Sequence, residues 1–456
     1  GSGRRQYSRA LSDWAPRFGF AYQVTKNTVL RGGYGIFYGP SYREAGATIG
    51  NQGFSSATSY VGSPNGLTPS IYIGNPFPNG LNPIVGSSQG LLSGIGSTFE
   101  TPITGDNHVP YMENWDFEIQ RQLPGNLLVD ASYVGSHGVH LNESGENDFN
   151  LNQLSPQSLA LGTKLQQSVP NPFFGLIATG PLAAATVPES YLLAPYPQFT
   201  GIEASYMTGG YSIYHAFQMK IEKRFSQGLS ALVSFTGQKL IDEYAIVSNV
   251  GHNTGGIQNI YDLKAERGVS SNDISRTLVV SGVYSLPFGR GQRFGTNWNR
   301  GLNSVLGGWQ ANGIATNQTG FPLSPTTQNT SAAGGNVLRP NVNGQDPALN
   351  TPIGSRLGGY FNTSVFSQPA PFTFGNAGRT LPNVRSEGAQ NIDFSLFKSF
   401  EVKERFSVQF RAEAFNLLNQ VVFGIPNMVL SSGQFGVVST QSNTPRSLQF
   451  ALKLLF

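Results

Sequence analysis

The sequence predicts an all-β protein, an antiparallel transmembrane β-barrel, and three observations lead to this fold class. The 456 residues include 56 glycines and 53 aromatic residues (31 Phe, 18 Tyr and 4 Trp), but only 12% are charged. Polar and apolar residues alternate along many segments, and short connections alternate with long ones. The charged fraction is about half of the ~25% that is usual for soluble domains. The aromatic content excludes a chain that is too polar to collapse.

Composition also excludes several classes of protein. The chain has no cysteine, which rules out a disulfide scaffold, a Cys-ligated zinc site and a thiol nucleophile. No segment approaches the ~18 consecutive apolar residues of a membrane-spanning helix. The net charge is only +4 and the basic residues are scattered, whereas proteins that bind nucleic acid concentrate positive charge on one face or tail. We therefore expect no nucleic-acid partner.

The strands are predicted from alternation with a period of two. Because successive side chains of a strand point to opposite faces, the stretch 448–456 has one apolar face and one more polar face. The same pattern predicts about eleven strands, each near the ~9–11 residues that cross a bilayer as a tilted strand. They lie at about 16–24, 28–38, 111–122, 126–136, 211–224, 228–239, 276–287, 307–319, 389–400, 404–417 and 447–456.

The connections between these strands alternate in length. Tight links lie at 25–27, 123–125, 225–228 and 401–404, and segment 288–306 is intermediate. Long links lie at about 39–110, 137–210, 240–275, 320–388 and 418–446. Outer-membrane barrels have short periplasmic turns and long extracellular loops. We therefore expect all long loops outside the cell. They show no evident internal order, except that 151–168 could hold one or two helical turns.

Several segments resemble a known family. The closing strand resembles the β-signal by which outer-membrane barrels are recognised for insertion. Other stretches are similar to the C-terminal barrel of TonB-dependent outer-membrane receptors, in particular the Oar-like group, which carries a carboxypeptidase-regulatory-like domain in front. These stretches are residues 15–22 (APRFGFAY), 31–38 (RGGYGIFY), 133–138 (YVGSHG), 222–228 (EKRFSQG), 285–291 (SLPFGRG) and 410–419 (FRAEAFNLLN).

The resemblance implies a barrel of 22 strands around an N-terminal plug, with uptake energised through a TonB box. We find no plug, TonB box or signal peptide in residues 1–456, and only about half of the strands. We therefore expect the C-terminal half of a longer receptor barrel, located in the outer membrane of a Gram-negative-type bacterium. The implied partners are outer-membrane lipid, the barrel-insertion machinery and an unknown extracellular ligand. The periplasmic TonB complex would act only through the missing N-terminal regions.

Two sets of residues are the candidates for function. The apolar residues of the closing strand are predicted to form the membrane-insertion signal: Phe450, Leu452, Leu454 and Phe456. A second set is predicted to face the barrel lumen, because an Arg or Lys on the lipid face costs about 2–4 kcal/mol at the bilayer midplane. This set consists of Lys220, Glu222, Arg224, Gln409, Arg411 and Glu413. A network that braces the wall or a plug is favoured over direct contact with a ligand.

The sequence predicts no catalytic residue, cofactor or metal site. His137 and His140 lack a third ligand nearby, and the carboxylates Glu143, Glu146 and Asp148 do not have the spacing of a calcium loop. The chain has only five histidines and no nucleophile elbow. We expect a non-enzymatic receptor barrel. A passive porin-like channel and a surface all-β adhesion or binding module are the alternatives.

Overall fold

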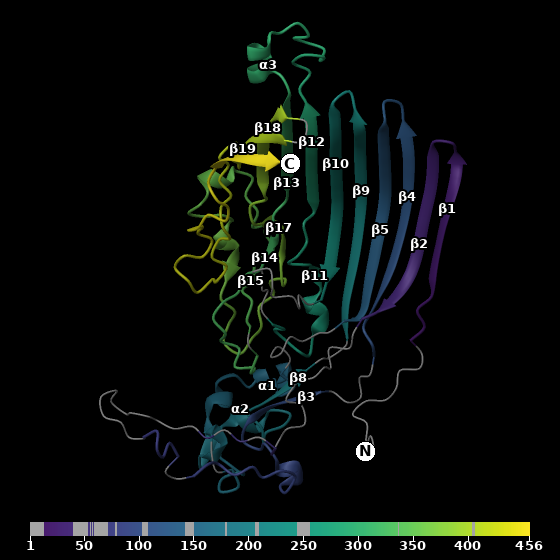
Figure 1. The fold of residues 1–456 in the computed structure, drawn as a ribbon. Helices are drawn as coiled ribbons and strands as arrows, with labels where there is room; N and C mark the ends of the chain where they lie inside the picture. Colours follow the sequence, from purple (N-terminus) through teal and green to yellow (C-terminus); the bar gives the residue numbers. More distant parts are fainter. Residues whose placement is uncertain are drawn as a thin grey trace.

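One large antiparallel sheet dominates the structure (Figure 1). The computed structural model describes residues 13–39, 53–54, 56, 58, 72–77, 80–102, 108–141, 150–177, 180–205, 209–243, 256–335, 337–403 and 406–456. Its long strands are β1 (Arg17–Thr25), β2 (Thr28–Tyr38), β4 (Tyr111–Leu123), β5 (Leu127–Leu141), β9 (Gly210–Ser226), β10 (Leu229–Asp242), β12 (Arg276–Ser285), β13 (Trp309–Gln318), β18 (Gln390–Lys403), β19 (Phe406–Phe415) and β20 (Ser447–Leu455).

The sheet is an up-and-down meander. Its order is β1-β2-β4-β5-β9-β10-β12-β13-β18-β19-β20, so each long strand pairs with the next long strand in the sequence. The short strand β11 (Gly268–Val269) adds to the end of β10. All eleven predicted strands are confirmed, with ends within about three residues of the prediction except for β5, which runs on to Leu141.

The pairing separates the side chains into two faces. Residues directly opposite one another in the ladder lie on the same face of a sheet. One face, the apolar face, carries Phe20, Tyr22, Leu30, Phe117, Ile119, Ala131, Tyr133, Phe217, Met219, Phe235 and Leu278. The other, the polar face, carries Asp116, Glu118, Gln120, Asp130, Ser132, Gln218, Lys220, Ser234 and Thr236.

Tight turns gather at one edge of the sheet and long loops at the other. At the β9–β10 hairpin, Gln227 and Gly228 both have positive φ angles, 53° and 81°, as a two-residue type I′ turn requires. This turn lies at the same edge as those of β1–β2 and β4–β5, together with helix α3 (Arg300–Leu306) (Figure 1). We call it the turn edge, and the opposite one the loop edge.

The described loops contain more structure than the sequence analysis expected. Residues 151–168 do hold helical turns, in α1 (Pro156–Leu159) and a 3-10 helix at Gly162–Gln166. Beyond these, the loops contain helix α2 (Glu189–Leu192), the parallel pair β3 (Thr98–Pro102) and β8 (Gly201–Ser205), and three antiparallel pairs. The pairs are β6 (Ser168–Pro170) with β7 (Thr186–Pro188), β14 (Pro322–Leu323) with β17 (Leu381–Arg385), and β15 (Asn341–Val342) with β16 (Phe366–Ser367).

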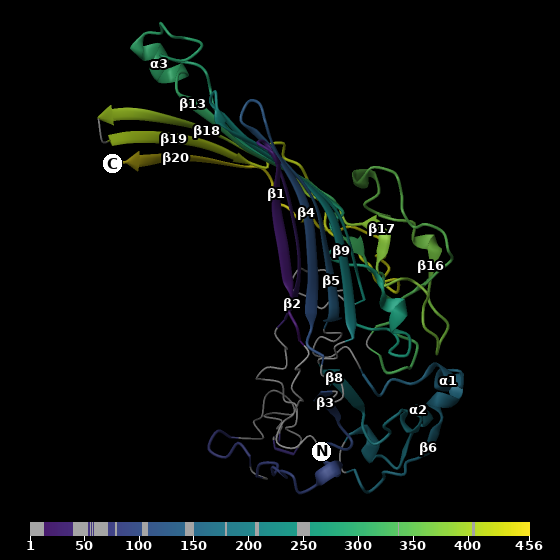
Figure 2. The ribbon, with the colours of Figure 1, turned by 90° about the vertical axis from the view of Figure 1, so that its right-hand side faces the viewer.

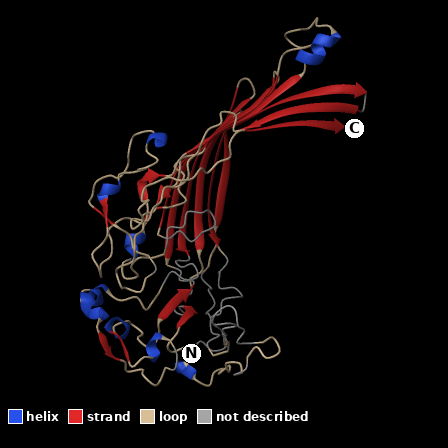
Figure 3. Cartoon of the chain, turned by 90° about the vertical axis from the view of Figure 1, so that its left-hand side faces the viewer, coloured by secondary structure: helices blue, strands red, loops and turns tan. Residues whose placement is uncertain are grey.

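The remaining helices are short as well. They include 3-10 turns at Gly90–Leu92, Pro181–Ala183, Leu263–Glu266, Ile353–Ser355 and Thr363–Val365. Figure 3 shows that the short helices other than α3 lie among the loops. In the described part of the chain, no helix combines the length and apolar character that crossing a bilayer requires.

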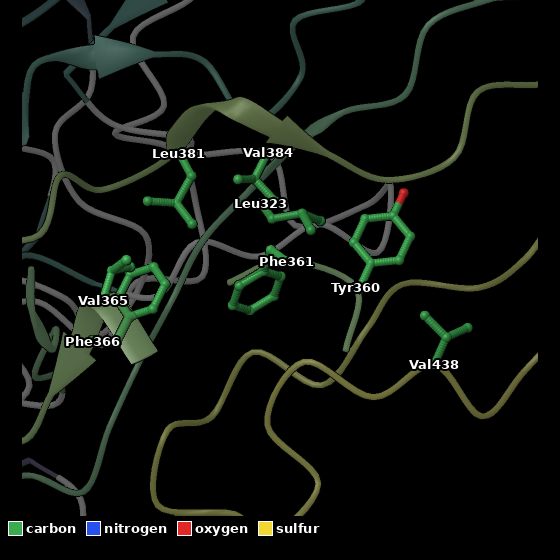
Figure 4. Close-up of a cluster of buried hydrophobic side chains, with 8 residues drawn as sticks. All are labelled: Leu323, Tyr360, Phe361, Val365, Phe366, Leu381, Val384 and Val438. Atoms are coloured by element: carbon green, nitrogen blue, oxygen red, sulfur yellow. The ribbon is translucent and has the colours of Figure 1, made fainter. Parts of the chain in front are cut away.

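The buried hydrophobic core lies in the loops rather than on the sheet. We call the described residues 80–102, 150–177, 180–205, 256–275, 320–335, 337–388 and 418–446 the loop lobe. Figure 2 shows part of this lobe, with β16 and β17, beside the sheet. Among the described residues, the buried hydrophobic side chains belong to the loop lobe, with Ala216 on β9 as the exception. The largest cluster packs Tyr360 and Phe361 against Val438 from a different loop (Figure 4).

The apolar face of the sheet therefore requires another environment. Its side chains include Phe217, which is 49% exposed at the middle of β9. A continuous exposed apolar surface of this kind would aggregate in water, but it is the surface that a lipid bilayer covers.

We predict that substitutions on the two faces differ in their effect. Phe217→Arg should lower the free energy of unfolding in lipid vesicles by about 2–4 kcal/mol, because it places a charge on the lipid-facing side near the midplane. The neighbouring Gln218→Arg, on the polar face, should change it by less than about 1 kcal/mol. Urea titration of the refolded protein measures both values. Equal losses for the two variants would contradict the assignment of the faces.

Candidate functional site

Three of the predicted lumen residues form a charged row on β9. The Lys220 ammonium lies 3.2 Å from one oxygen of Glu222, and the Arg224 guanidinium lies 3.6 Å from the other. Alternation places all three on the polar face. Their side chains are between a third and two thirds exposed, so each ion pair contributes little to stability. Their charges thus remain accessible from the polar side of the sheet.

The other three predicted residues follow the same face along β19. The Arg411 Nε donates a hydrogen bond to the Gln409 Oε1 at 2.8 Å, and its guanidinium lies over the Phe397 ring. Gln409 in turn donates to the Ser399 hydroxyl of β18. Glu413 lies opposite Gln449 of β20. Gln409 and Arg411 thereby connect β19 to β18, whereas Glu413 faces β20 across the ladder.

A groove brings the two strands together. Its volume is about 560 Å³, and Lys220, Glu222 and Glu413 all line it. Arg224, Gln409 and Arg411 lie outside its lining. β9 and β19 are five strand steps apart in the sheet, or about 24 Å along a flat sheet at ~4.8 Å per step. The polar face must therefore be the concave side of a curved sheet, with the groove within its curvature.

Apolar side chains in this groove were missed by the sequence analysis. Leu232, Val283, Ile314 and Phe415 line it, and Ile314 is 52% exposed. The register places Ile314 between Ser281 and Asp393 on the polar face. Local alternation alone does not reveal them, because each lies next to an apolar or small residue of the other face; only the cross-strand register could have found them. The groove therefore offers apolar contact between carboxylates and a lysine.

The closing strand has its apolar residues on the apolar face. Phe450, Leu452 and Leu454 lie opposite Ala412, Phe410 and Val408 of β19, respectively. Phe456 follows the end of β20 and is fully exposed. Among the described strands, β20 pairs with β19 alone, so its other edge presents backbone N–H and C=O groups.

Three ion pairs at the loop edge join the 320–388 loop to the end of β10 and to the connection that follows it. The Arg339 guanidinium binds Glu266 through two nitrogens, at 2.6 and 3.0 Å, and both side chains are buried. Arg379 pairs with Asp242 at the end of β10. Arg385 pairs with Asp273 at 2.5 Å. In each pair, the arginine comes from the 320–388 loop and the acid from the β10–β12 connection or its start.

Buried amides extend this network to a third loop. The Gln258 Oε1 accepts a hydrogen bond from the Arg339 backbone N–H, and the backbone N–H of Gln258 donates to the Glu266 carboxylate. The Gln153 amide donates to the Gln258 carbonyl and accepts from the Ile260 N–H. Since buried polar groups are costly when unpaired, these bonds fix the three loops in one arrangement.

One tyrosine of the loop lobe has a strongly shifted pKa. Burial raises the pKa of Tyr360 to about 12, against a partial opposing effect of the nearby Arg356. The Tyr360 hydroxyl donates to the Arg385 backbone carbonyl at 2.8 Å. It remains protonated at physiological pH and acts as a hydrogen-bond donor in the packing of the lobe.

The histidine pair of the sequence analysis does not converge. The His137 Nδ1 lies 2.9 Å from a Glu113 oxygen, whereas the His140 ring stacks on His108. Within the ranges that the structure describes, no three His, Cys, Asp or Glu side chains form a cluster that could hold a metal ion. The carboxylates Glu143, Glu146 and Asp148 lie outside the described residues.

We predict that the buried pair, unlike an exposed one, holds the loops closed. Arg339→Met should lower the free energy of opening of the loop lobe by about 3–5 kcal/mol, because it leaves the Glu266 carboxylate buried and unpaired. Arg31→Met, which removes the exposed Arg31–Glu118 pair on the polar face, should change it by less than about 1 kcal/mol. Hydrogen exchange of peptides from 256–275 and 337–388 measures this. Equal protection of these peptides in the two variants would refute the locking role.

Comparisons with solved structures return outer-membrane transporters and receptors at low identity. The outer membrane transporter YddB from Escherichia coli is 12% identical with a TM-score of 0.42, over 96% of this chain and 40% of that one. The ferric-catecholate import receptor Fiu from E. coli K12 is 10% identical with a TM-score of 0.40, over 96% and 34%. The pyoverdine receptor FpvA from Pseudomonas aeruginosa is 9% identical with a TM-score of 0.38, over 97% and 36%.

The chain thus spans about a third to two fifths of the length of these structures. No match was found among curated proteins. A family model described as "Outer membrane beta barrel domain" matches residues 1–449, which is nearly the entire chain. This match agrees with the meander, its exposed apolar face and the alternation of short and long connections. The chain belongs to the outer membrane β-barrel domain family and is a protein of the Gram-negative outer membrane.

Proposed function

We propose that this chain is the C-terminal portion of a TonB-dependent receptor barrel of the Oar-like group. In this proposal, the loop lobe captures an extracellular ligand and the groove on the concave face guides it inward. The mechanism is non-catalytic. Energy from the periplasmic TonB complex would enter through a plug outside the residues of this chain.

The observation that carries this proposal is the ordered loop lobe. Its loops are joined by buried ion pairs and hydrophobic clusters. They therefore form one fixed surface and do not move independently of one another. A passive channel requires only an open lumen, whereas selective capture requires binding groups held in fixed positions. A lobe of this kind on a barrel therefore favours a receptor over a porin.

The two free edges of the sheet support the fragment interpretation. Among the described strands, β1 and β20 each pair with a single neighbour, although a transmembrane barrel must satisfy every backbone group. In a larger barrel, further strands would cover both edges. The family resemblance of residues 15–456 also favours a barrel of 22 strands, of which the eleven here would form half.

We assign the predicted residues to two roles. Gln409 and Arg411 brace the wall of the lumen, because they connect β19 to β18, whereas Lys220, Glu222 and Arg224 form ion pairs within β9 alone. Glu413, together with the apolar Ile314 and Phe415, is free to contact a ligand or a plug in the groove. The exposed stripe of Phe450, Leu452, Leu454 and Phe456 would be the signal that the barrel-insertion machinery recognises.

Energised uptake by the native, full-length protein tests the proposal. We expect deletion of its gene to slow uptake of one nutrient from a panel of labelled ferric siderophores, oligosaccharides and peptides. A proton uncoupler, or deletion of the TonB gene, should slow that uptake to the same extent in the wild type and have no further effect in the deletion strain. Glu413→Lys should reduce the uptake more than the wall substitution Arg411→Gln, which lies outside the lining of the groove.

The two other functions give different results. A passive channel predicts uptake that follows the concentration gradient and is unaffected by the uncoupler. An adhesion module predicts unchanged uptake of every nutrient, with loss of cell-surface binding alone. Either result would refute the receptor proposal.

A further inference from the structure

The connection between β12 and β13 departs from the pattern of the turn edge. The described turns of the other hairpins at this edge have two or three residues, at 26–27, 124–126 and 227–228. Residues 286–308, by contrast, fold into a compact segment that contains α3 (Figure 1). We call this segment the foot. Because a hairpin needs only two residues to reverse direction, the additional residues require another explanation.

Two side chains from the apolar face hold the foot in place. The Trp309 indole N–H donates to the Val305 carbonyl at 2.8 Å. The Lys398 ammonium donates to the Val305 carbonyl at 3.2 Å and to the Gly307 carbonyl at 2.5 Å. Trp309, Lys398 and Phe410 lie opposite one another on the apolar face. The C-terminal end of α3 is therefore attached to the apolar side of the sheet.

The surroundings of Lys398 support a position of this attachment at a boundary between lipid and water. The residue is 4% exposed and its ammonium also lies 5.2 Å from the Trp309 ring and 5.3 Å from the Phe400 ring. A lysine on a lipid-facing surface is tolerated near the interface, where its ammonium can reach polar groups. Here the polar groups are the carbonyls at the end of α3, where the helix dipole also favours a cation.

The exposed side of α3 is also apolar. Leu302, Val305 and Leu306 are 41%, 63% and 49% exposed, respectively. Phe288 and Phe294 contact each other at the base of the foot, with ring centroids 5.7 Å apart, and are also exposed. A helix of seven residues is not stable in water by itself, but β12 and β13 attach α3 to the lipid-facing side of the sheet.

The charges of the foot have a single sign. Arg290, Arg293 and Arg300 are all exposed, and residues 286–308 contain no aspartate or glutamate. Exposed arginines next to exposed leucine, valine and phenylalanine are typical of segments that lie in the membrane interface and bind anionic lipids. Guanidinium groups also match the geometry of phosphate oxygens.

We propose that the foot is a lipid-binding site, with α3 lying in the membrane interface and the arginines bound to phosphate groups of anionic phospholipids. The partner is the lipid leaflet at the turn edge, which the proposed topology places on the periplasmic side. This binding is separate from ligand capture and does not depend on which ligand the receptor takes up.

The depth of α3 in the membrane tests the proposal first. Since the chain has no cysteine, Val305→Cys and the turn control Asn27→Cys each give a single site for a nitroxide label. In vesicles that contain a quarter phosphatidylglycerol, the label at 305 should be accessible to oxygen and shielded from a water-soluble nickel reagent. The label at 27 should show the opposite. Full nickel accessibility at 305 would mean a surface for a soluble partner and would overturn the proposal.

The role of the arginines is tested in the same full chain. Arg293→Gln with Arg300→Gln should lower the ratio of bound phosphatidylglycerol to phosphatidylcholine, measured by native mass spectrometry, by about tenfold to thirtyfold. Lys164→Gln with Lys264→Gln removes the same charge from exposed positions at the loop edge and should leave the ratio unchanged. An equal effect of both double variants, or of neither, would overturn the assignment of the arginines. Circular dichroism confirms that each variant is folded.

Discussion

The antiparallel hydrogen-bond ladder is the constraint on which the rest of the structure depends. Each long strand from β1 to β20 pairs with the next, without a gap in the sheet. A slip of one residue in this pairing would move every side chain of a strand to the other face. The irregularities lie near strand ends, as between Leu229 and Ala231 or between Gly138 and Leu141. The middle of the sheet thereby keeps one apolar and one polar face across all eleven long strands.

This constraint explains where the core lies. With lipid covering the apolar face, the sheet does not need a layer of helices or a second sheet. Compact packing is instead found among the loops, where Leu323, Tyr360 and Val438 come together from separate segments. The loop lobe thus resembles a small globular domain made of connections, and its ion pairs attach it to the end of β10 and to the residues that follow.

The sheet could be predicted from the sequence, whereas the site could be predicted only in part. Alternation is a local property, so each strand could be recognised from its own residues. The groove depends on register and curvature across five strand steps, which is why Glu413 and Lys220 could be placed on the same face but not in the same groove. Ile314 could not be placed there at all from its own strand.

The contacts of the loop lobe and the foot could not be predicted from the sequence for a different reason. Glu266 and Arg339 are 73 residues apart in the chain, and nothing in either neighbourhood identifies its partner. Lys398 of β18, which contacts the foot, lies on a face that alternation marks as apolar, and its role becomes clear only from its hydrogen bonds to the carbonyls at the end of α3. Long-range packing, rather than local propensity, decides both.

The membrane-facing assignment of the sheet is tested most directly on β4, which has a partner strand on each side. Single cysteines at each residue from 115 to 120, labelled with a polarity-sensitive bimane in lipid vesicles, report the environment of both faces. Our account predicts blue-shifted emission at 115, 117 and 119, and emission typical of water at 116, 118 and 120. Emission that is uniform along the strand, or alternation with the opposite phase, would contradict it.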